Sequence, residues 1–142
     1  MSTPIVITGM HRSGTSLLAN LLMEAGVAVG ERLRGPTEGN LKGYFEDEDF
    51  VEFHEAILKA NGTSWSLDNF PRVLQINEVH RAKAHELISK RRNLSIWGWK
   101  DPRTSLFLDF WAALLPEARF IFVFRRAGEV VESLRRRSDW EL

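Results

Sequence analysis

The sequence predicts an α/β fold in three layers, with a parallel sheet of the P-loop type flanked by helices on both faces. Along the 142 residues, short apolar runs rich in β-branched or aromatic residues alternate with longer segments of helical periodicity. The first run passes through a glycine-rich turn straight into a helical segment. Strand, glycine loop and helix in this order form the context of a phosphate-binding loop. Ligands of such folds lie at the carboxyl ends of the strands.

The N-terminal elements follow from clear local signals. A buried strand is predicted from Pro4 to Thr8, and a helix from Gly14 to Ala25 carries leucines at helical spacing before Gly26 ends it. The segment from Gly30 to Gly43 contains Gly-Pro and Gly-Asn pairs and is predicted to be a loop. Loops of this length in compact domains are often functional.

Two helices are predicted in the middle of the chain. The first runs from Asp47 to Ala60 with one apolar stripe, and the second, polar and weakly amphipathic, runs from Ile76 to Arg91. His54 lies on the apolar stripe, so we expect a core histidine whose hydrogen bonds are satisfied within the protein.

The C-terminal part continues the alternation. A strand is predicted from Ser95 to Trp99, followed by a helix from Leu106 to Leu115. The next strand, Arg119 to Phe124, is almost continuously apolar, as expected of a parallel strand covered on both faces. A last helix carries Val130, Val131 and Leu134 on one side.

Composition indicates a single domain over residues 1–142 and excludes several classes of protein. Lysine plus arginine equals aspartate plus glutamate at 19 each, so no net field attracts nucleic acid or a membrane surface. The chain has no cysteine, which excludes disulfides and thiolate metal sites, and no apolar run reaches the ~18 residues of a membrane helix. We therefore expect a cytoplasmic protein without nucleic-acid or membrane partners.

The glycine loop is "GMHRSGTS", from Gly9 to Ser16, and it has the spacing Gly-x-x-x-x-Gly-Lys-Ser/Thr with Thr15 at the lysine position. Backbone amides at the start of the following helix form an anion site. Thr15 cannot reach the β- and γ-phosphates as the lysine of nucleotide hydrolases does, which argues against a kinase or ATPase. Arg12, inside the loop, offers a planar cation to a sulfuryl or phosphoryl group.

"RSGTS" resembles the 5′-phosphosulfate loop of sulfotransferases that use 3′-phosphoadenosine 5′-phosphosulfate (PAPS). These enzymes also hold the 3′-phosphate with an arginine at a strand end and a serine eight residues later, and here Arg125 and Ser133 have that spacing. The segments "WGWKDPR" and "GYFED" resemble bacterial members of the family.

The resemblance implies a role for each matching residue. Arg12 would stabilise charge on the bridging oxygen, Lys100 would lie near the transferred group, and Arg125 with Ser133 would hold the 3′-phosphate. No metal is implied. The backbone amides that would hold the 5′-phosphate are those of Ser13, Gly14, Thr15 and Ser16.

The sequence also departs from the family pattern. Many members carry tryptophan where Leu17 stands, and the basic glycine-containing loop that follows near their C-terminus has no counterpart before Leu142. We therefore expect the N-terminal portion of a sulfotransferase domain, incomplete at its C-terminus, or a shortened relative.

Sulfuryl transfer to a hydroxyl requires a base for the acceptor proton, and the family uses histidine or glutamate. Glu46, at the end of "GYFE", is the first candidate. His11 is expected to donate a hydrogen bond rather than to act as the base. Asp101 before Pro102 is the usual N-cap and N1 pair of a helix. Arg103 either reaches the mouth of the site or lies in the first helical turn.

Together these features predict an enzyme that transfers the sulfuryl group of PAPS to a hydroxyl or amine of a small-molecule, carbohydrate or peptide acceptor. The alternatives are a P-loop kinase acting on a nucleotide or small molecule, and a catalytically silent nucleotide-binding domain. The sequence names neither the acceptor nor the oligomeric state.

Overall fold

A computed structural model describes residues 2–36 and 43–137. Its described sheet has three parallel strands in the order β2-β1-β3, so β1 (Thr3–Gly9) lies between β2 (Ile96–Lys100) and β3 (Arg119–Val123). Val6 pairs with Trp99 on one side and with Phe120 on the other. All three strands therefore end at the same edge of the sheet, which is where the ligand site was expected.

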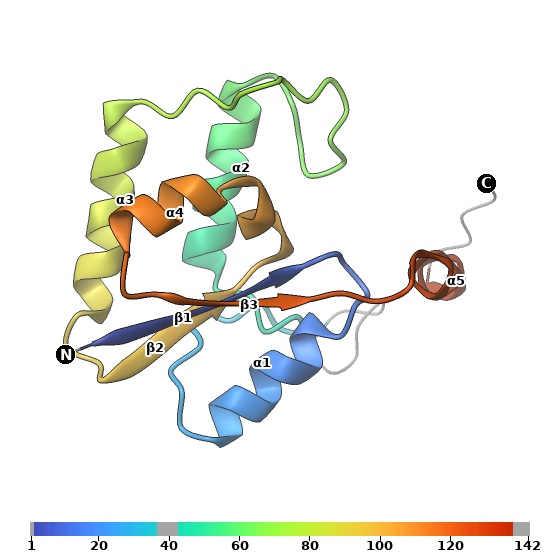
Figure 1. Ribbon diagram of the computed structural model, residues 1–142, viewed down its shortest axis with the longest axis horizontal. Coiled ribbons are helices and arrows are strands. Elements are labelled where there is room, and N and C mark those ends of the chain that lie inside the picture. The colour runs from blue at the N-terminus through green and yellow to red at the C-terminus, as the bar shows by residue number, and fades with distance from the viewer. Residues whose placement is uncertain (1, 37–42, 138–142) are drawn as a thin grey trace.

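Helices cover both faces of this sheet (Figure 1). One face carries α1 (Thr15–Glu24), and α5 (Ala127–Arg137) lies beyond the carboxyl end of β3. This arrangement confirms the predicted three-layer α/β fold. The opposite face carries α2 (Glu48–Ala60), α3 (Glu78–Arg91), the 3-10 helix η1 (Pro102–Leu106) and α4 (Leu108–Leu114).

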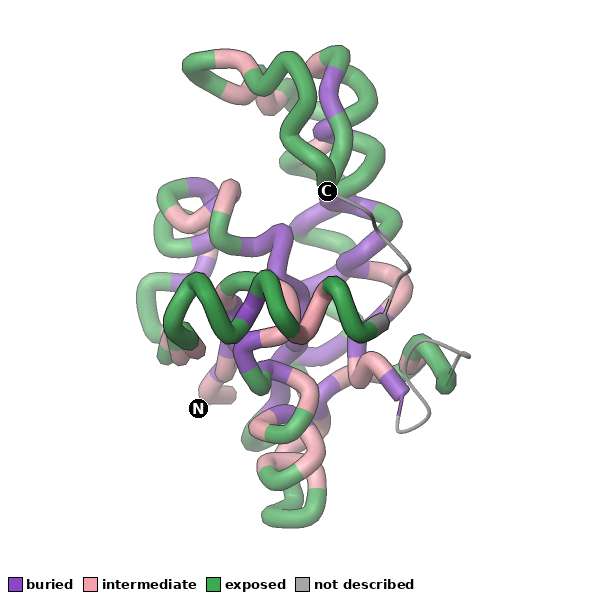
Figure 2. Tube along the Cα trace, turned by 90° about the vertical axis from the view of Figure 1, so that its right-hand side faces the viewer, coloured by how far each residue is buried: buried purple, intermediate pink, exposed green. Residues whose placement is uncertain are grey.

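The core is divided by β1, whose successive side chains point to opposite faces. Val6 belongs to the larger apolar cluster under α2 and α3, and Ile7 belongs to the smaller one under α1. In the larger cluster the rings of Phe50 and Trp99 stack with their centroids 4.1 Å apart, and Trp111 packs against both. The strands β1 and β2 are largely buried, whereas the connection between α2 and α3 is mostly exposed (Figure 2).

Two expectations about the C-terminal half were wrong. β3 is an outer strand of the described sheet and is not covered on both faces: Phe122 within it is 54% exposed, and Phe124, just after it, is 89% exposed. A continuous apolar run does not reveal which neighbours a strand has, so this position was not readable from the sequence. The predicted helix from Leu106 is divided into η1 and α4 at Phe107, whose backbone is not helical.

The predicted N-cap at Asp101 is confirmed, although it caps η1 rather than an α-helix: its side chain accepts from the Arg103 amide. The predicted long loop lies partly outside the described residues, which omit 37–42. Among the described residues, no helix has the length and apolar character needed to cross a membrane.

Candidate functional site

Three residues of the glycine loop have positive φ: Gly9 at 140°, Arg12 at 67° and Gly14 at 102°. Gly14 is the N-cap of α1, without any side-chain cap. A glycine meets this left-handed geometry at low cost. Because no side chain covers the helix start, the first amides of α1 are directed toward the cavity lined by Gly14, Thr15 and Ser16.

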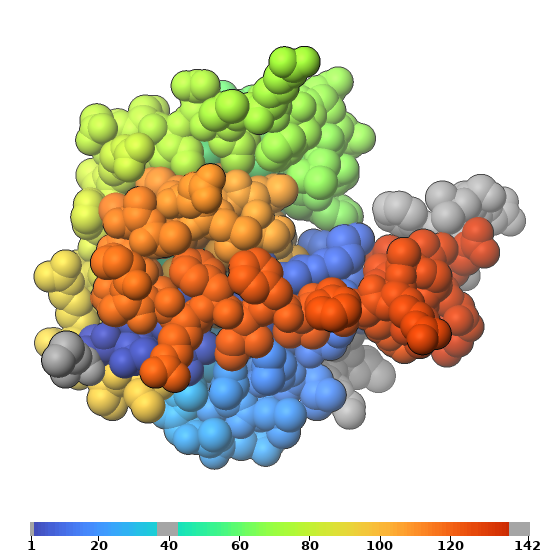
Figure 3. All heavy atoms as spheres, viewed as in Figure 1, coloured from blue at the N-terminus to red at the C-terminus, as the bar shows by residue number. Residues whose placement is uncertain are grey.

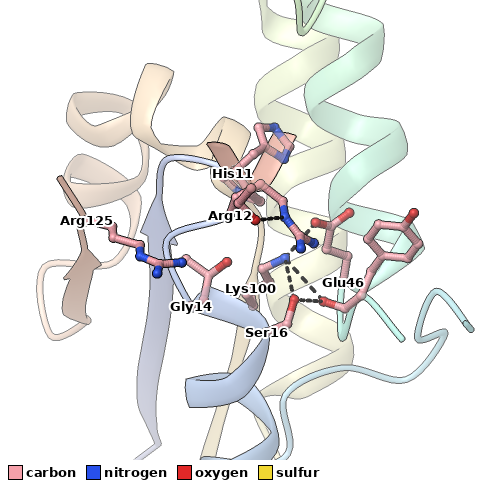
Figure 4. Close-up of a pocket in the computed structure, with 11 residues that line it drawn as sticks. His11, Arg12, Gly14, Ser16, Glu46, Lys100 and Arg125 are labelled. Atoms are coloured by element: carbon pink, nitrogen blue, oxygen red, sulfur yellow. Dashed lines mark hydrogen bonds and ion pairs between the residues drawn. The ribbon is translucent and has the colours of Figure 1, made fainter. Parts of the chain in front are cut away.

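That cavity has a volume of about 240 Å³ and opens at the carboxyl edge of the sheet (Figure 4). It brings together residues that lie far apart in the sequence. All of the predicted site residues except Ser13 line it. Ser13 is buried in the same loop, and its hydroxyl oxygen has no hydrogen-bond partner among the described residues. The lining residues are His11, Arg12, Gly14, Thr15, Ser16, Tyr44, Glu46, Lys100, Pro102, Arg125 and Ser133.

Lys100 and Glu46 form the centre of the site. Lys100 is the last residue of β2, and its Nζ donates to Glu46 Oε1 at 2.7 Å; both side chains are 3% exposed. The same ammonium donates to the Tyr44 carbonyl at 3.2 Å and lies 3.5 Å from Ser16 Oγ. One buried cation thus joins the end of a strand, the segment before α2 and the start of α1.

Further cations surround the Glu46 carboxylate. Arg103 Nη1 lies 3.7 Å from Oε2 and Arg34 Nη1 lies 3.9 Å from the same oxygen. A buried carboxylate requires such compensation because it has lost its hydration. Of the two positions left open for Arg103, the structure supports the second: Arg103 lies in the first turn of η1 and does not line the cavity. Its side chain is buried and also pairs with Glu55 at 3.1 Å.

The residues predicted to hold a 3′-phosphate lie at the other end of the cavity. Arg125 follows β3 and points toward Gly14 in Figure 4, with its side chain 46% exposed and its Nε 3.4 Å from Glu129. Ser133, on α5, accepts a hydrogen bond of 3.0 Å from Arg12 Nε. In Figure 3, α5 lies against the segment that follows β1. The loop arginine therefore also fixes the helix that carries Ser133.

Asp101 organises the layer beneath the cavity. Its carboxylate is fully buried and accepts from His54 Nδ1 at 2.7 Å and from Arg103 Nη1 at 2.7 Å. His54 Nε2 accepts from Trp111 Nε1 at 2.8 Å, so both ring nitrogens are used and the ring is the neutral tautomer. The expected core histidine is thereby confirmed in its position. Burial alone would raise the pKa of Asp101, but the His54 hydrogen bond and the Arg103 charge lower it to about 2.

The lowered pKa of Asp101 predicts that acid destabilises the folded chain. Because the pKa of Asp101 is about 2 in the folded chain against 3.8 without its partners, its contribution to stability is complete above pH 3.8 and is lost as the pH falls toward 2. Asp101→Asn should reduce the free energy of unfolding at pH 7 by on the order of 2 kcal/mol, and the difference from the wild type should narrow below pH 3.

Urea titrations between pH 2 and 7 measure this difference. Asp109→Asn, at an exposed position of α4, is the matched control. Its free energy of unfolding should follow that of the wild type at every pH. A gap between the wild type and Asp101→Asn that stays constant down to pH 2 would contradict the assigned pKa.

Several residues of the site were missed by sequence reasoning. Tyr44 contributes its backbone carbonyl, which carries no sequence signal, and Pro102 was interpreted only as the first residue of a helix. In the described residues, no group of three or more histidine, cysteine, aspartate or glutamate side chains gathers in a geometry that would hold a metal ion.

Comparisons with known proteins agree with the motifs. Residues 4–141 match the sequence model of a family described as the Sulfotransferase family. Among solved structures, the chain is similar to sulfotransferase STF1 from Mycobacterium tuberculosis H37Rv, with 17% identity and a TM-score of 0.42, over 94% of this chain and 49% of that chain. It thus spans about half the length of that structure. No curated protein matches it significantly. On the family match over nearly its whole length, the chain belongs to the sulfotransferase family.

Proposed function

We propose that this chain binds PAPS and transfers its sulfuryl group to a hydroxyl or amine of a small-molecule, carbohydrate or peptide acceptor. The observation that carries the proposal is the meeting of Arg12, Lys100 and Arg125 in one cavity at the N-terminus of α1. Glu46 is the acidic residue that lines this cavity, and Lys100 compensates its charge. The cavity is therefore suited to a dianionic or polyanionic ligand.

The residues fit a phosphosulfate group. Ser13 Oγ is buried without a hydrogen-bond partner among the described residues, which is a cost unless a ligand or water supplies the partner. Gly14 leaves the helix start uncovered on the same side. When bound, PAPS supplies a sulfuryl group on a phosphate leaving group. The amides of Thr15 and Ser16 and the cations of Arg12 and Lys100 would bind, orient and electrostatically stabilise that end.

The 3′-phosphate would be bound by Arg125 and Ser133, which both line the cavity. The hydroxyl of Ser133 is already held by Arg12, so it is oriented before any ligand arrives. Arg125 is half exposed and is paired only with the exposed Glu129 in the described residues, so recruiting it toward a phosphate costs little.

The test compares 3′-phosphoadenosine 5′-phosphate (PAP) with AMP, which lacks only the 3′-phosphate, and with ATP plus magnesium. Hydrogen bonds to charged groups contribute roughly 1.5–3 kcal/mol, so calorimetry at low salt should give PAP a preference of about 10- to 100-fold over AMP. Arg125→Ala should remove most of this preference and Ser133→Ala a smaller part, with AMP affinity nearly unchanged.

Arg126→Ala is the matched control, because Arg126 is the adjacent exposed arginine and does not line the cavity. Tighter binding of ATP with magnesium would favour the kinase, and PAP binding with no transfer would favour the silent binding domain. Equal affinity for PAP and AMP in a folded chain would refute the assignment of the 3′-phosphate site.

A further inference from the structure

His11 lines the cavity and has no part in the proposed binding roles. It lies in the glycine loop beside Arg12, and its ring packs edge-on against Trp65, with centroids 5.8 Å apart and an interplanar angle of 66°. Neither ring nitrogen makes a hydrogen bond to a described residue. Figure 4 shows the ring at the top of the cavity, above Glu46. An oriented imidazole with unoccupied nitrogens thus borders the space where a ligand would lie.

The surroundings favour a neutral ring. The pKa of His11 is lowered from 6.5, mainly because burial disfavours the charged form; Glu46 opposes this shift. The charges of Arg103 and Lys100 lower the pKa further, and Asp101 raises it. At pH 7 the neutral ring therefore predominates, and one of its nitrogens carries a lone pair, as a general base requires.

The two other candidates for this role are both engaged. Glu46 holds Lys100 through Oε1, and its Oε2 faces Arg103 and Arg34. His54 is completely buried and uses both nitrogens on Asp101 and Trp111. A proton taken up by either would disrupt an interaction that holds the site together. A proton on His11 disrupts none, and the nearby Glu46 carboxylate favours the resulting cation.

We propose that His11 is the general base of this site, a role that rests on the proposed sulfuryl transfer. The acceptor oxygen forms a bond to sulfur while the bond from sulfur to the bridging oxygen of PAPS breaks. The electron pair of the broken bond goes to the 5′-phosphate of PAP, beside Arg12, and the acceptor proton goes to a nitrogen of His11. Glu46 is then a positioning residue, which fixes Lys100 and stabilises protonated His11.

The first test is the pH dependence of PAPS hydrolysis, with water as the probe acceptor. Sulfate release by the wild type should rise through a midpoint below pH 6.5 and then level off. His11→Gln should lower kcat by about 10²-fold or more and abolish that midpoint, with PAP affinity changed by no more than a few-fold. Glu46→Gln should move the midpoint to lower pH without abolishing it, because the carboxylate raises the pKa of His11. The control is His85→Gln, at an exposed position of α3.

The second test does not depend on turnover. In a proton NMR titration, the ring signal that disappears in His11→Gln should titrate with a midpoint below 6.5. A midpoint above 6.5, or a His11→Gln variant that keeps wild-type kcat and pH midpoint, would each overturn the proposal. Failure of the proposed function gives different results: either PAP is not preferred to AMP, or the wild type prefers PAP yet never releases sulfate, and the assignment of a base then falls with the proposed transfer.

Discussion

Arg12→Gln is expected to lower kcat for sulfuryl transfer by about 10²- to 10³-fold, while PAP affinity changes by only a few-fold. The guanidinium lines the cavity next to the start of α1. In the proposed transfer, charge would develop there on the bridging oxygen. Removing a group that acts mainly in the transition state lowers kcat more than ground-state binding. Steady-state kinetics with PAPS, together with PAP calorimetry, separate these two effects.

Two other properties of Arg12 affect the choice of the residue that replaces it. Its φ of 67° is unfavourable for most residues, so glutamine, which keeps a long polar side chain, is a better replacement than alanine. Its hydrogen bond to Ser133 also fixes α5. Ser133→Ala removes that bond but keeps the charge, so it should retain kcat within a few-fold. An Arg12→Gln enzyme with nearly wild-type kcat would refute the proposed role.

Lys100→Met is expected to lower the free energy of unfolding by about 3–5 kcal/mol, a large part of the stability of a domain of this size. The substitution leaves the Glu46 carboxylate buried without its 2.7 Å partner. It also removes the ammonium that joins Tyr44 to Ser16. Urea denaturation measures the loss, with Lys59→Met, at an exposed position of α2, as the control.

A double variant separates the lost charge pair from lost packing. Lys100→Met combined with Glu46→Gln removes both charges, so it should recover most of the lost stability. It should not recover transfer activity, because the cation that we propose to lie near the transferred group is still absent. If the double variant is as unstable as Lys100→Met alone, the unpaired carboxylate is not the cause of the instability.

The sequence was most informative where structure depends on neighbouring residues. The order of strand, glycine loop and α1 was predictable because a phosphate loop is set by local backbone geometry and by the residues from Gly9 to Ser16. Arg125 and Ser133 were predictable for a similar reason, since a strand end and the following helix hold them at fixed spacing. The cap at Asp101 is likewise a local feature.

Contacts between distant segments were not predictable in this way. Glu46 and Lys100 were each proposed for the site, but nothing in their spacing showed that they bind one another. Arg103 lies between the buried carboxylates of Glu46 and Asp101. These groups come together only because η1 packs against α2 and the residues just before it. The exposed outer position of β3 could not be predicted, because the order of the strands is a property of the whole sheet.

The position of β1 in the middle of the sheet has a consequence for how the chain reaches its native state. β1 is made first, yet Thr3 pairs with Ile96 and Ile5 with Arg119. Each pairing closes a very long loop, and such non-local contacts slow folding relative to helical proteins of equal length. During synthesis at the ribosome, the apolar strand β1 therefore stays unpaired until β2 and β3 have been made. Unpaired apolar strands of this kind make nascent chains prone to aggregation.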